Sequence, residues 1–468
     1  MRLIPIYTWN KGVLEFNKRS DRLSKKPWFQ GVLLMVCVLA AMLLANLPFS
    51  KDFYHGLLET RIQLHLHSEN GLVDVLFPRE MTVEKFINDI LMVIFFFTVG
   101  LEIRREIAHG ELSSPKKAML PVIAAFGGVI APALIYTLIN RGTMAASGWG
   151  IPTATDIAFA VCILSMLGDK VPVSLKVFLT ALAIADDLIA ILVVAIFYGG
   201  QINFLLLGIA VLVILLALLL RHIEEKHIFP YLICAVAVWA LFYYSGIHAT
   251  MSGVVMAFLI PARSRYNKSQ YFHKRNHYLE LVDKMDGIDR EPFPNGPQKH
   301  ALRQLEKIAR GSMDMTYRVE HALTPWVKFL IMPIFALANA GVEISDPSYF
   351  NVFSADAALG SVSMGIFLGL LLGKPVGITL FSWLAIKCKV GAMPEKSGWP
   401  MFFAVACLGG IGFTMSIFVD TLSFGEQAPE VMMRLRDAGK IAVLMGSVCA
   451  GVLGTALINL VAKMKKSA

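Results

Sequence analysis

The stretch PVSLKVFLTALAIADDLIAILVVAIFY (172–198) decides the fold class of this chain. Apart from Lys176, Asp186 and Asp187 it is made of apolar or small side chains, and it is long enough for a helix to cross a bilayer, which takes about 17–25 residues. An ionisable group in the middle of a membrane helix costs about 2.5–3.5 kcal/mol and therefore tends to face a cavity or a partner. Two adjacent carboxylates in mid-span indicate a function more than they indicate packing.

Apolar segments of similar length recur along the whole chain. Besides 172–198 they cover 29–47, 86–101, 118–140, 151–167, 204–220, 228–245, 247–262, 321–343, 362–386, 399–422 and 438–462. The 468 residues are 56% hydrophobic and 16% charged, against about 45–50% and about 25% in soluble domains. These numbers disfavour a water-soluble fold of this size and exclude a disordered chain. The pattern predicts an all-α polytopic membrane protein with twelve transmembrane helices.

The positive charges indicate how the spans are oriented. If the N-terminus is cytoplasmic, the cytoplasmic loops hold most of the 43 Lys and Arg residues, whereas the external loops hold few, Arg434, Arg436 and Lys440 among them. We therefore expect both termini in the cytoplasm. The net charge of +9 is mainly this orientation signal, so we expect no nucleic-acid partner. The first 28 residues are too long and too charged for a typical signal peptide.

Charge and hydropathy divide the chain into parts. These are a cytoplasmic N-terminal segment (1–28), eight spans (29–262), a cytoplasmic insertion (263–320), and four spans with a short cytoplasmic tail (321–468). Within 51–85 the residues from Ile62 to His67 alternate with period two before Asn70-Gly71, which predicts an external β-hairpin. The insertion is rich in turn signals and holds one helical pattern, near 299–310.

Four charges stand where lipid-facing residues are expected: Asp156, Asp186, Asp187 and Lys374. Neighbouring residues of a helix point about 100° apart, so one carboxylate of the adjacent pair can face a water-filled cavity while the other faces a neighbouring helix. Lys374 is the obvious counter-charge for one of them. Small rearrangements of such a cluster can move protons near neutral pH, as a proton-coupled carrier requires. Asp156, beside Thr155, also has the sequence of a helix cap.

Two spans contain signals that break a helix. The fourth holds GWGIPTATD (148–156) and the eleventh holds GGIGFTMS (409–416). Glycines in a membrane helix often serve only close packing. Interrupted spans in corresponding positions of two repeats, however, are typical of an ion site at the membrane midplane, where free helix ends and carbonyl groups bind ions. We predict discontinuous helices 4 and 11, with spans 3 to 5 and 10 to 12 as inverted repeats.

These residues and motifs resemble the NhaA family of sodium/proton antiporters from about residue 29 to 462. The matching stretches are INDILMVIFFFTVGLEIRRE (87–106), PVIAAFGGVIAPALIY (121–136), TATDIAFA (153–160), VPVSLKVFLTALAIADDLIAI (171–191), GIHATMSG (246–253), RVEHALTPWV (318–327), FALANAG (335–341), GKPVGI (373–378) and GIGFTMSIF (410–418).

The resemblance implies a role for each charge of the cluster. Asp187 would be the principal cation-binding carboxylate, and Asp186 its partner, held by Lys374. Thr155 and Asp156 would lie where the broken helices cross, with Asp156 balancing positive helix ends. Sodium or lithium ions at Asp187 and Asp186, together with protons, would be the transported species. Neither a cofactor nor enzyme activity is expected.

The resemblance also implies a region that responds to pH near the cytoplasmic entrance. Its candidates are Glu102, Glu106, His248, Glu320 and His321. Each can equally be a solvated helix end or a satisfied core histidine. The chain departs from the family pattern at several places, namely Ala185, Ile189, Tyr317, Thr324, Lys328 and the long insertion 263–318.

The resemblance thus implies a sodium(lithium)/proton antiporter of the bacterial inner membrane. It would extrude cytoplasmic sodium in exchange for external protons by alternating access and contribute to pH and sodium homeostasis. The family also suggests dimerisation through the 51–85 hairpin. The alternative is another sodium-coupled carrier, such as an organic-anion symporter. An intramembrane aspartyl protease is disfavoured because its two aspartates must converge from different helices, whereas Asp186 and Asp187 are consecutive.

Overall fold

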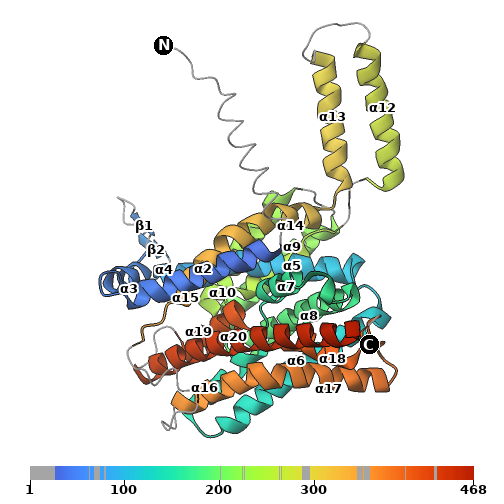
Figure 1. Ribbon diagram of the computed structural model, residues 1–468. Coiled ribbons are helices and arrows are strands. Elements are labelled where there is room, and N and C mark those ends of the chain that lie inside the picture. The colour runs from blue at the N-terminus through green and yellow to red at the C-terminus, as the bar shows by residue number, and fades with distance from the viewer. Residues whose placement is uncertain are drawn as a thin grey trace, which may run out of the picture. The chain divides into compact units, whose positions relative to one another are not determined.

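The structure is a computed structural model, and it is helical apart from one short two-stranded sheet in the residues that it describes (Figure 1). The described residues are 27–62, 64–67, 74–77, 81–200, 202–223, 225, 227–262, 264, 266–286, 296–344, 352, 359–395, 397–425 and 430–467. Almost all of the predicted N-terminal segment 1–28 lies outside them.

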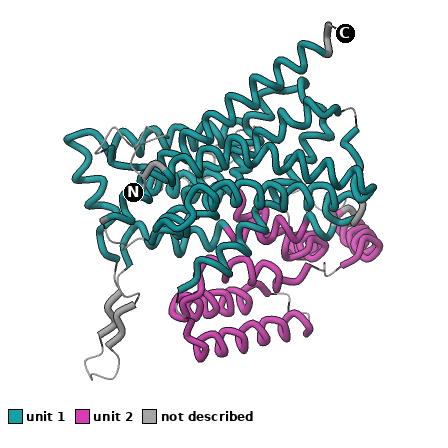
Figure 2. The backbone as a smooth tube through the Cα atoms, turned by 90° about the horizontal axis from the view of Figure 1, so that it is seen from below, with its two compact units in different colours: residues 1–95, 106–201, 325–468 teal, residues 96–105, 202–324 magenta. Residues whose placement is uncertain are grey.

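The chain forms two compact units (Figure 2). Unit 1 comprises residues 1–95, 106–201 and 325–468, and unit 2 comprises residues 96–105 and 202–324. Helices α5 (Met92–His109) and α14 (Met315–Trp326) run from one unit into the other.

Unit 1 holds most of the helices and the sheet. Its elements are α2 (Pro27–Asn46), α3 (Lys51–Glu59), β1 (Leu64–His67), β2 (Asp74–Phe77), α4 (Val83–Phe86), η1 (Ile87–Leu91), α6 (Pro115–Ile139), η2 (Met144–Thr153), α7 (Ile157–Met166), η3 (Gly168–Lys170), α8 (Val173–Phe197), η4 (Val327–Ile331), α15 (Met332–Asn339), α16 (Leu359–Leu368), η6 (Gly369–Gly373), α17 (Lys374–Lys387), α18 (Trp399–Leu408), α19 (Phe413–Phe424) and α20 (Glu430–Ser467). Of the η segments, η2 and η3 are 3₁₀-helical, and η1, η4 and η6 are π-helical.

Unit 2 combines membrane-length helices with a pair of polar helices. Its elements are α9 (Phe204–His222), α10 (Ile228–Ser245), α11 (Met251–Leu259), α12 (Lys268–Asp286) and α13 (Gly296–Ser312). Helices α9, α10 and α11 pack around Val238, Phe242 and Met256, while α9 leaves a face with Leu212 and Leu216 exposed. An apolar core on one side and exposed leucines on the other are the arrangement of a helix that faces lipid.

The number of membrane-length helices differs from the prediction of twelve. Nine helices of the described part are long and apolar enough to cross a membrane, or up to eleven if each of two bent pairs counts as one span. The predicted span that is not among these eleven is 247–262, because its helix α11 has only nine residues. Gly246 ends α10 with a left-handed backbone (φ 86°), and a turn precedes Met251. The apolar stretch is thus divided between a turn and a short helix.

The two predicted interruptions are present as bends. Segments η2 and α7 meet at 40°, and α18 and α19 meet at 52°, each across a break of at most four residues. Both pairs belong to unit 1. The broken spans therefore lie where the glycine- and proline-rich sequences GWGIPTATD and GGIGFTMS occur.

Strands β1 and β2 form an antiparallel hairpin in the region where alternation predicts one. Leu64 pairs with Phe77 and His67 with Asp74. The Asn70-Gly71 turn lies outside the described residues. The external location of this hairpin stays a prediction.

The insertion 263–320 contains two helices, α12 and α13, which pack side by side (Figure 1). Helix α13 includes the stretch 299–310 in which the sequence pattern predicts a helix. Its apolar side is buried at Ala301 and Ile308. The insertion is therefore a helical hairpin rather than a plain loop in its described part.

Candidate functional site

The five predicted ion-site residues lie together in the interior of unit 1. Thr155, Asp156, Asp186, Asp187 and Lys374 are each at most 3% exposed. They come from the break of the fourth span, from α8 and from the start of α17. Four ionisable side chains in one buried region need hydrogen-bond or charge partners inside the protein.

Close helix packing fixes the position of Lys374. Helix α17 packs against α6 with the backbones of Gly377 and Gly127 in contact, so that a Cβ atom on either glycine would overlap the carbonyl oxygen of the other. Lys374 itself begins α17 directly after the π-helical turn η6, an irregularity that frequently marks a functional site.

Lys374 makes a buried ion pair with one of the two adjacent aspartates. Its Nζ donates to Oδ2 of Asp186 at 2.5 Å and to Oγ1 of Thr155 at 2.8 Å. Oδ1 of Asp186 accepts no hydrogen bond from the described residues. The structure thus brings Asp186, Lys374 and Thr155 into direct contact.

Asp187 follows Asp186 on α8 and is equally buried. Consecutive helical residues point about 100° apart, so its carboxylate takes a different direction from that of Asp186. The positive charge of Lys374 lies close enough to interact with it electrostatically. One lysine therefore acts on both carboxylates but is hydrogen-bonded to Asp186.

Asp156 connects the two broken spans. It is the N-cap of α7, where its Oδ1 accepts from the backbone N–H of Phe159 at 3.3 Å. Its Oδ2 accepts from the backbone N–H of Thr414 at 3.2 Å and from the Thr414 hydroxyl. One carboxylate therefore caps the first turns of both α7 and α19, where the positive ends of two helix dipoles meet. The helix-cap interpretation of Asp156 is confirmed.

Further bonds connect the two breaks. The backbone N–H of Asp156 donates to the Ile411 carbonyl at 2.7 Å, and the Thr155 hydroxyl donates to the Gly409 carbonyl at 2.8 Å. Oγ of Ser447 on α20 accepts from the N–H groups of Gly412 and Phe413 at 3.2 and 3.1 Å. These backbone groups at the breaks thus find partners inside the protein, as a non-helical segment at membrane depth requires.

The partners Thr414, Gly409 and Ser447 are not predicted by the sequence. The first two stand out only as part of a glycine-rich break, and nothing in the sequence near Ser447 indicates that it approaches that break. The pairing is a tertiary feature that local patterns do not encode.

Two of the five pH-response candidates, Glu102 and Glu320, share Arg105 as a neighbour. In unit 2, Arg105 pairs with the buried Glu320 and lies 3.6 Å from Glu102. His321 stacks on Tyr317 with ring centroids 5.8 Å apart.

The other two candidates make local contacts. Glu106, which belongs to unit 1, accepts from the backbone N–H of Glu111 at 3.1 Å. His248 is half-buried in the turn before α11, and its carbonyl accepts from the N–H of Met251 at 3.0 Å.

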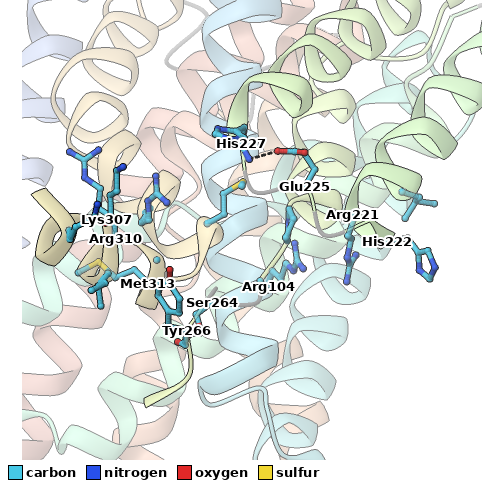
Figure 3. Close-up of a pocket in the computed structure, with 18 residues that line it drawn as sticks. Arg104, Arg221, His222, Glu225, His227, Ser264, Tyr266, Lys307, Arg310 and Met313 are labelled. Carbon is cyan, nitrogen blue, oxygen red and sulfur yellow. Dashed lines mark hydrogen bonds between the residues drawn. The ribbon is translucent and has the colours of Figure 1, made fainter. Parts of the chain in front are cut away.

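Unit 2 also contains a cavity of about 1130 Å³ with a basic lining (Figure 3). Arg104, Arg221, Lys307 and Arg310 are among its lining residues. The carboxylate of Glu225 also faces it and accepts from the N–H of His227 at 2.9 Å. None of the five ion-site residues lines this cavity.

Two more charges are buried in unit 1. Asp420 on α19 is 0% exposed and Lys440 on α20 is 3% exposed. The assignment of Lys440 to an external loop was wrong, because α20 begins at Glu430 and Lys440 lies within it. Asp420 was overlooked, although its signal is a single aspartate inside the apolar stretch 399–422.

In the described part of the chain, nine membrane-length helices, two bent helix pairs and buried carboxylates with a lysine beside the bends are typical of an ion-coupled secondary transporter. A family model described as Na+/H+ antiporter 1 matches residues 21–458. The chain belongs to this family of sodium/proton antiporters, and it is a multi-pass membrane protein.

Individual relatives agree with the family match. The chain is 42% identical over 431 residues to a Na+/H+ antiporter NhaA of Oleidesulfovibrio alaskensis, covering 92% of this chain and 91% of the relative. It is 40% identical over 438 residues to one of Wolinella succinogenes, covering 94% and 92%. It is 37% identical over 425 residues to one of Citrobacter koseri, covering 91% and 93%.

Proposed function

We propose that this chain is a sodium/proton antiporter that exchanges cytoplasmic Na+ or Li+ for external protons at Asp187 and Asp186. Family membership and relatives that carry this name support the exchange of Na+ for H+. The observation that carries the assignment of the site is the buried contact of Lys374 with Asp186 and Thr155, next to the crossing of the two broken spans.

The chemistry of the site suits direct competition between a hard cation and protons. Sodium prefers oxygen ligands, and the Asp187 and Asp186 carboxylates, the Thr155 hydroxyl and carbonyl groups at the breaks are oxygen ligands. A cation that arrives displaces protons from the two carboxylates. When the loaded site opens to the other side and the cation leaves, external protons rebind.

Lys374 sets the charge of the site in each state. Without a cation, its ammonium group neutralises Asp186 through the 2.5 Å bond. A bound cation would repel this ammonium and take over Asp186. We therefore assign Lys374 a positioning role, with Asp187 as the principal ligand and Asp186 as the exchangeable partner.

The proposed topology has twelve crossings, of which the eighth is only partly helical. Nine residues of α11 rise about 14 Å, less than half of a hydrocarbon core of about 30 Å, so the turn before Met251 has to complete this crossing. Spans 3 to 5 and 10 to 12 would form the inverted repeats, with both termini in the cytoplasm. The bacterial relatives support an inner-membrane location.

Two finer proposals concern regulation and assembly. Protonation of Glu320 would weaken its pair with Arg105 and thereby alter the end of α14, which would couple pH to transport. The hairpin of β1 and β2 would join two copies of the chain into a dimer, an arrangement that the family suggests.

The substitution Asp187→Asn tests the assignment of the site. It keeps the size of the side chain but removes the negative charge, so sodium-induced proton movement in everted membrane vesicles is expected to vanish. Asp169→Asn, at an exposed position of η3, is the matched control and should leave exchange unchanged. Sodium-induced proton movement at the wild-type level in Asp187→Asn would refute Asp187 as the principal cation ligand.

A further inference from the structure

Asp420 and Lys440 are the buried charges that the proposed cycle does not use. They lie on α19 and α20, which pack against each other (Figure 1). Asp420 is seven residues beyond Phe413, the first residue of α19. At a rise of 1.5 Å per residue, it stands about 10 Å along α19 from the break, toward the connection to α20.

The carboxylate of Asp420 is buried and has no hydrogen-bond donor among the residues that the structure describes. Neither Oδ1 nor Oδ2 accepts a hydrogen bond from them. Oδ1 lies against Gly439, where a Cβ atom would overlap it, so the glycine is what makes room for the carboxylate. An ionised carboxylate without donors is costly to bury, which indicates that this group carries a ligand in part of the cycle.

The titratable groups around Asp420 come from three neighbouring elements. Helix α20 contributes Lys440, Arg436 and Asp437. Tyr136 of α6 and Tyr198, which follows α8, also interact with it electrostatically. Segments η2 and α15, which pack on α19 as well, contain no titratable side chain.

The charged groups of α20 have further titratable neighbours besides Asp420. Arg436 lies 3.9 Å from Glu84 of α4, and Glu84 also acts on Lys440. Glu343 and His55 act on Asp437. Lys440 and Arg436 thus have acidic neighbours other than Asp420, so they do not by themselves satisfy it.

A proton fits this position better than a metal cation. Sodium needs several oxygen ligands, whereas a proton needs one. Lys440 and Arg436 would also repel a second cation.

We propose that Asp420 is a second proton-binding carboxylate, which loads protons for exchange from the side of the α19–α20 connection. An Oδ–H bond forms with a proton from water and breaks when the proton moves on toward the carboxylates of the ion site. Lys440, on the neighbouring helix α20, balances the charge of the deprotonated state. This inference rests on the proposed antiport function.

Proteoliposomes holding the full chain, with the pH of each side set separately, test the proposal. Asp420→Asn leaves Asp187 and Asp186 in place, so sodium-driven exchange should persist when the α19–α20 side is acidic and protons are plentiful. When that side is alkaline, the rate should fall at least about tenfold, because a proton-relaying group is missing. Asp420→Glu should restore the wild-type profile.

A control and a second variant keep the outcome interpretable. Asp169→Asn should match the wild type at every pH. If Asp420→Asn does not fold, Asp420→Asn combined with Lys440→Gln removes both buried charges and should show the same selective loss at alkaline pH.

A wild-type pH profile in Asp420→Asn, or an equal loss at every pH, would overturn the proposal. Absence of sodium-driven proton flux in the wild-type chain would instead refute the antiport function itself.

Discussion

Unit 1 holds two buried acid and lysine pairs, and they are built differently. In the first, Lys374 donates to Asp186 at 2.5 Å and to Thr155 at 2.8 Å. In the second, Asp420 and Lys440 are equally buried, but Asp420 accepts no hydrogen bond. Burial of opposite charges in one unit therefore does not by itself produce a bonded ion pair.

The backbone explains the difference. Lys374 begins a helix after a π-helical turn and reaches the break of the fourth span, where Thr155 offers a hydroxyl oxygen. Lys440 lies inside the uninterrupted 38-residue helix α20, beside Asp420 on an equally regular part of α19. The break of the fourth span thus brings a side-chain hydroxyl to Lys374, whereas Lys440 lies within a continuous helix.

The largest expected effect comes from breaking the first pair on one side only. Lys374→Ala leaves Asp186 buried without its counter-charge and should lower the free energy of unfolding by about 3–5 kcal/mol. Unfolding by a denaturing detergent, followed by circular dichroism, measures it. Adding Asp186→Asn should recover much of the loss, whereas Lys328→Ala, at an exposed lysine, should cost little. A double variant no more stable than Lys374→Ala would contradict this interpretation.

A smaller effect is expected at the crossing of the broken spans. Thr414→Val removes the hydroxyl that donates to Asp156 but keeps the backbone donor, so the free energy of unfolding should fall by about 1.5 kcal/mol. Thr421→Val is the matched control on the same helix, because the Thr421 hydroxyl bonds only within α19, to the Ile417 carbonyl. The same unfolding titration compares them, and equal losses would show that the bridge to Asp156 adds nothing.

The smallest effect is expected at the second pair. Asp420→Asn together with Lys440→Met removes both charges and breaks no hydrogen bond of Asp420, so the free energy of unfolding should change by less than about 1 kcal/mol. The identical titration measures it. A loss as large as that of Lys374→Ala would mean that the two pairs stabilise the fold alike.

The sequence was sufficient where one residue carries the signal by itself. Asp186, Asp187 and Lys374 stand out because charges are rare in apolar spans, and the breaks stand out through glycine and proline. The prediction of the eighth span as a full-length helix was wrong. Hydropathy counts apolar residues, but it does not detect the left-handed backbone of Gly246 and the turn after it, which leave α11 with nine residues.

What the sequence did not predict depends on which segments meet. Thr414 and Ser447 are ordinary residues of apolar spans until the fold places them at the breaks. Asp420 escaped notice because it stands near the end of its predicted span, where a charge is commonly solvated. Its burial follows from Gly439, a feature of the neighbouring helix.

The contact of Asp156 has a mechanical consequence. One carboxylate holds the first turns of α7 and α19 together, so a motion that separates these two half-helices has to break the hydrogen bonds of Asp156. Asp156 therefore couples the position of one half-helix to that of the other.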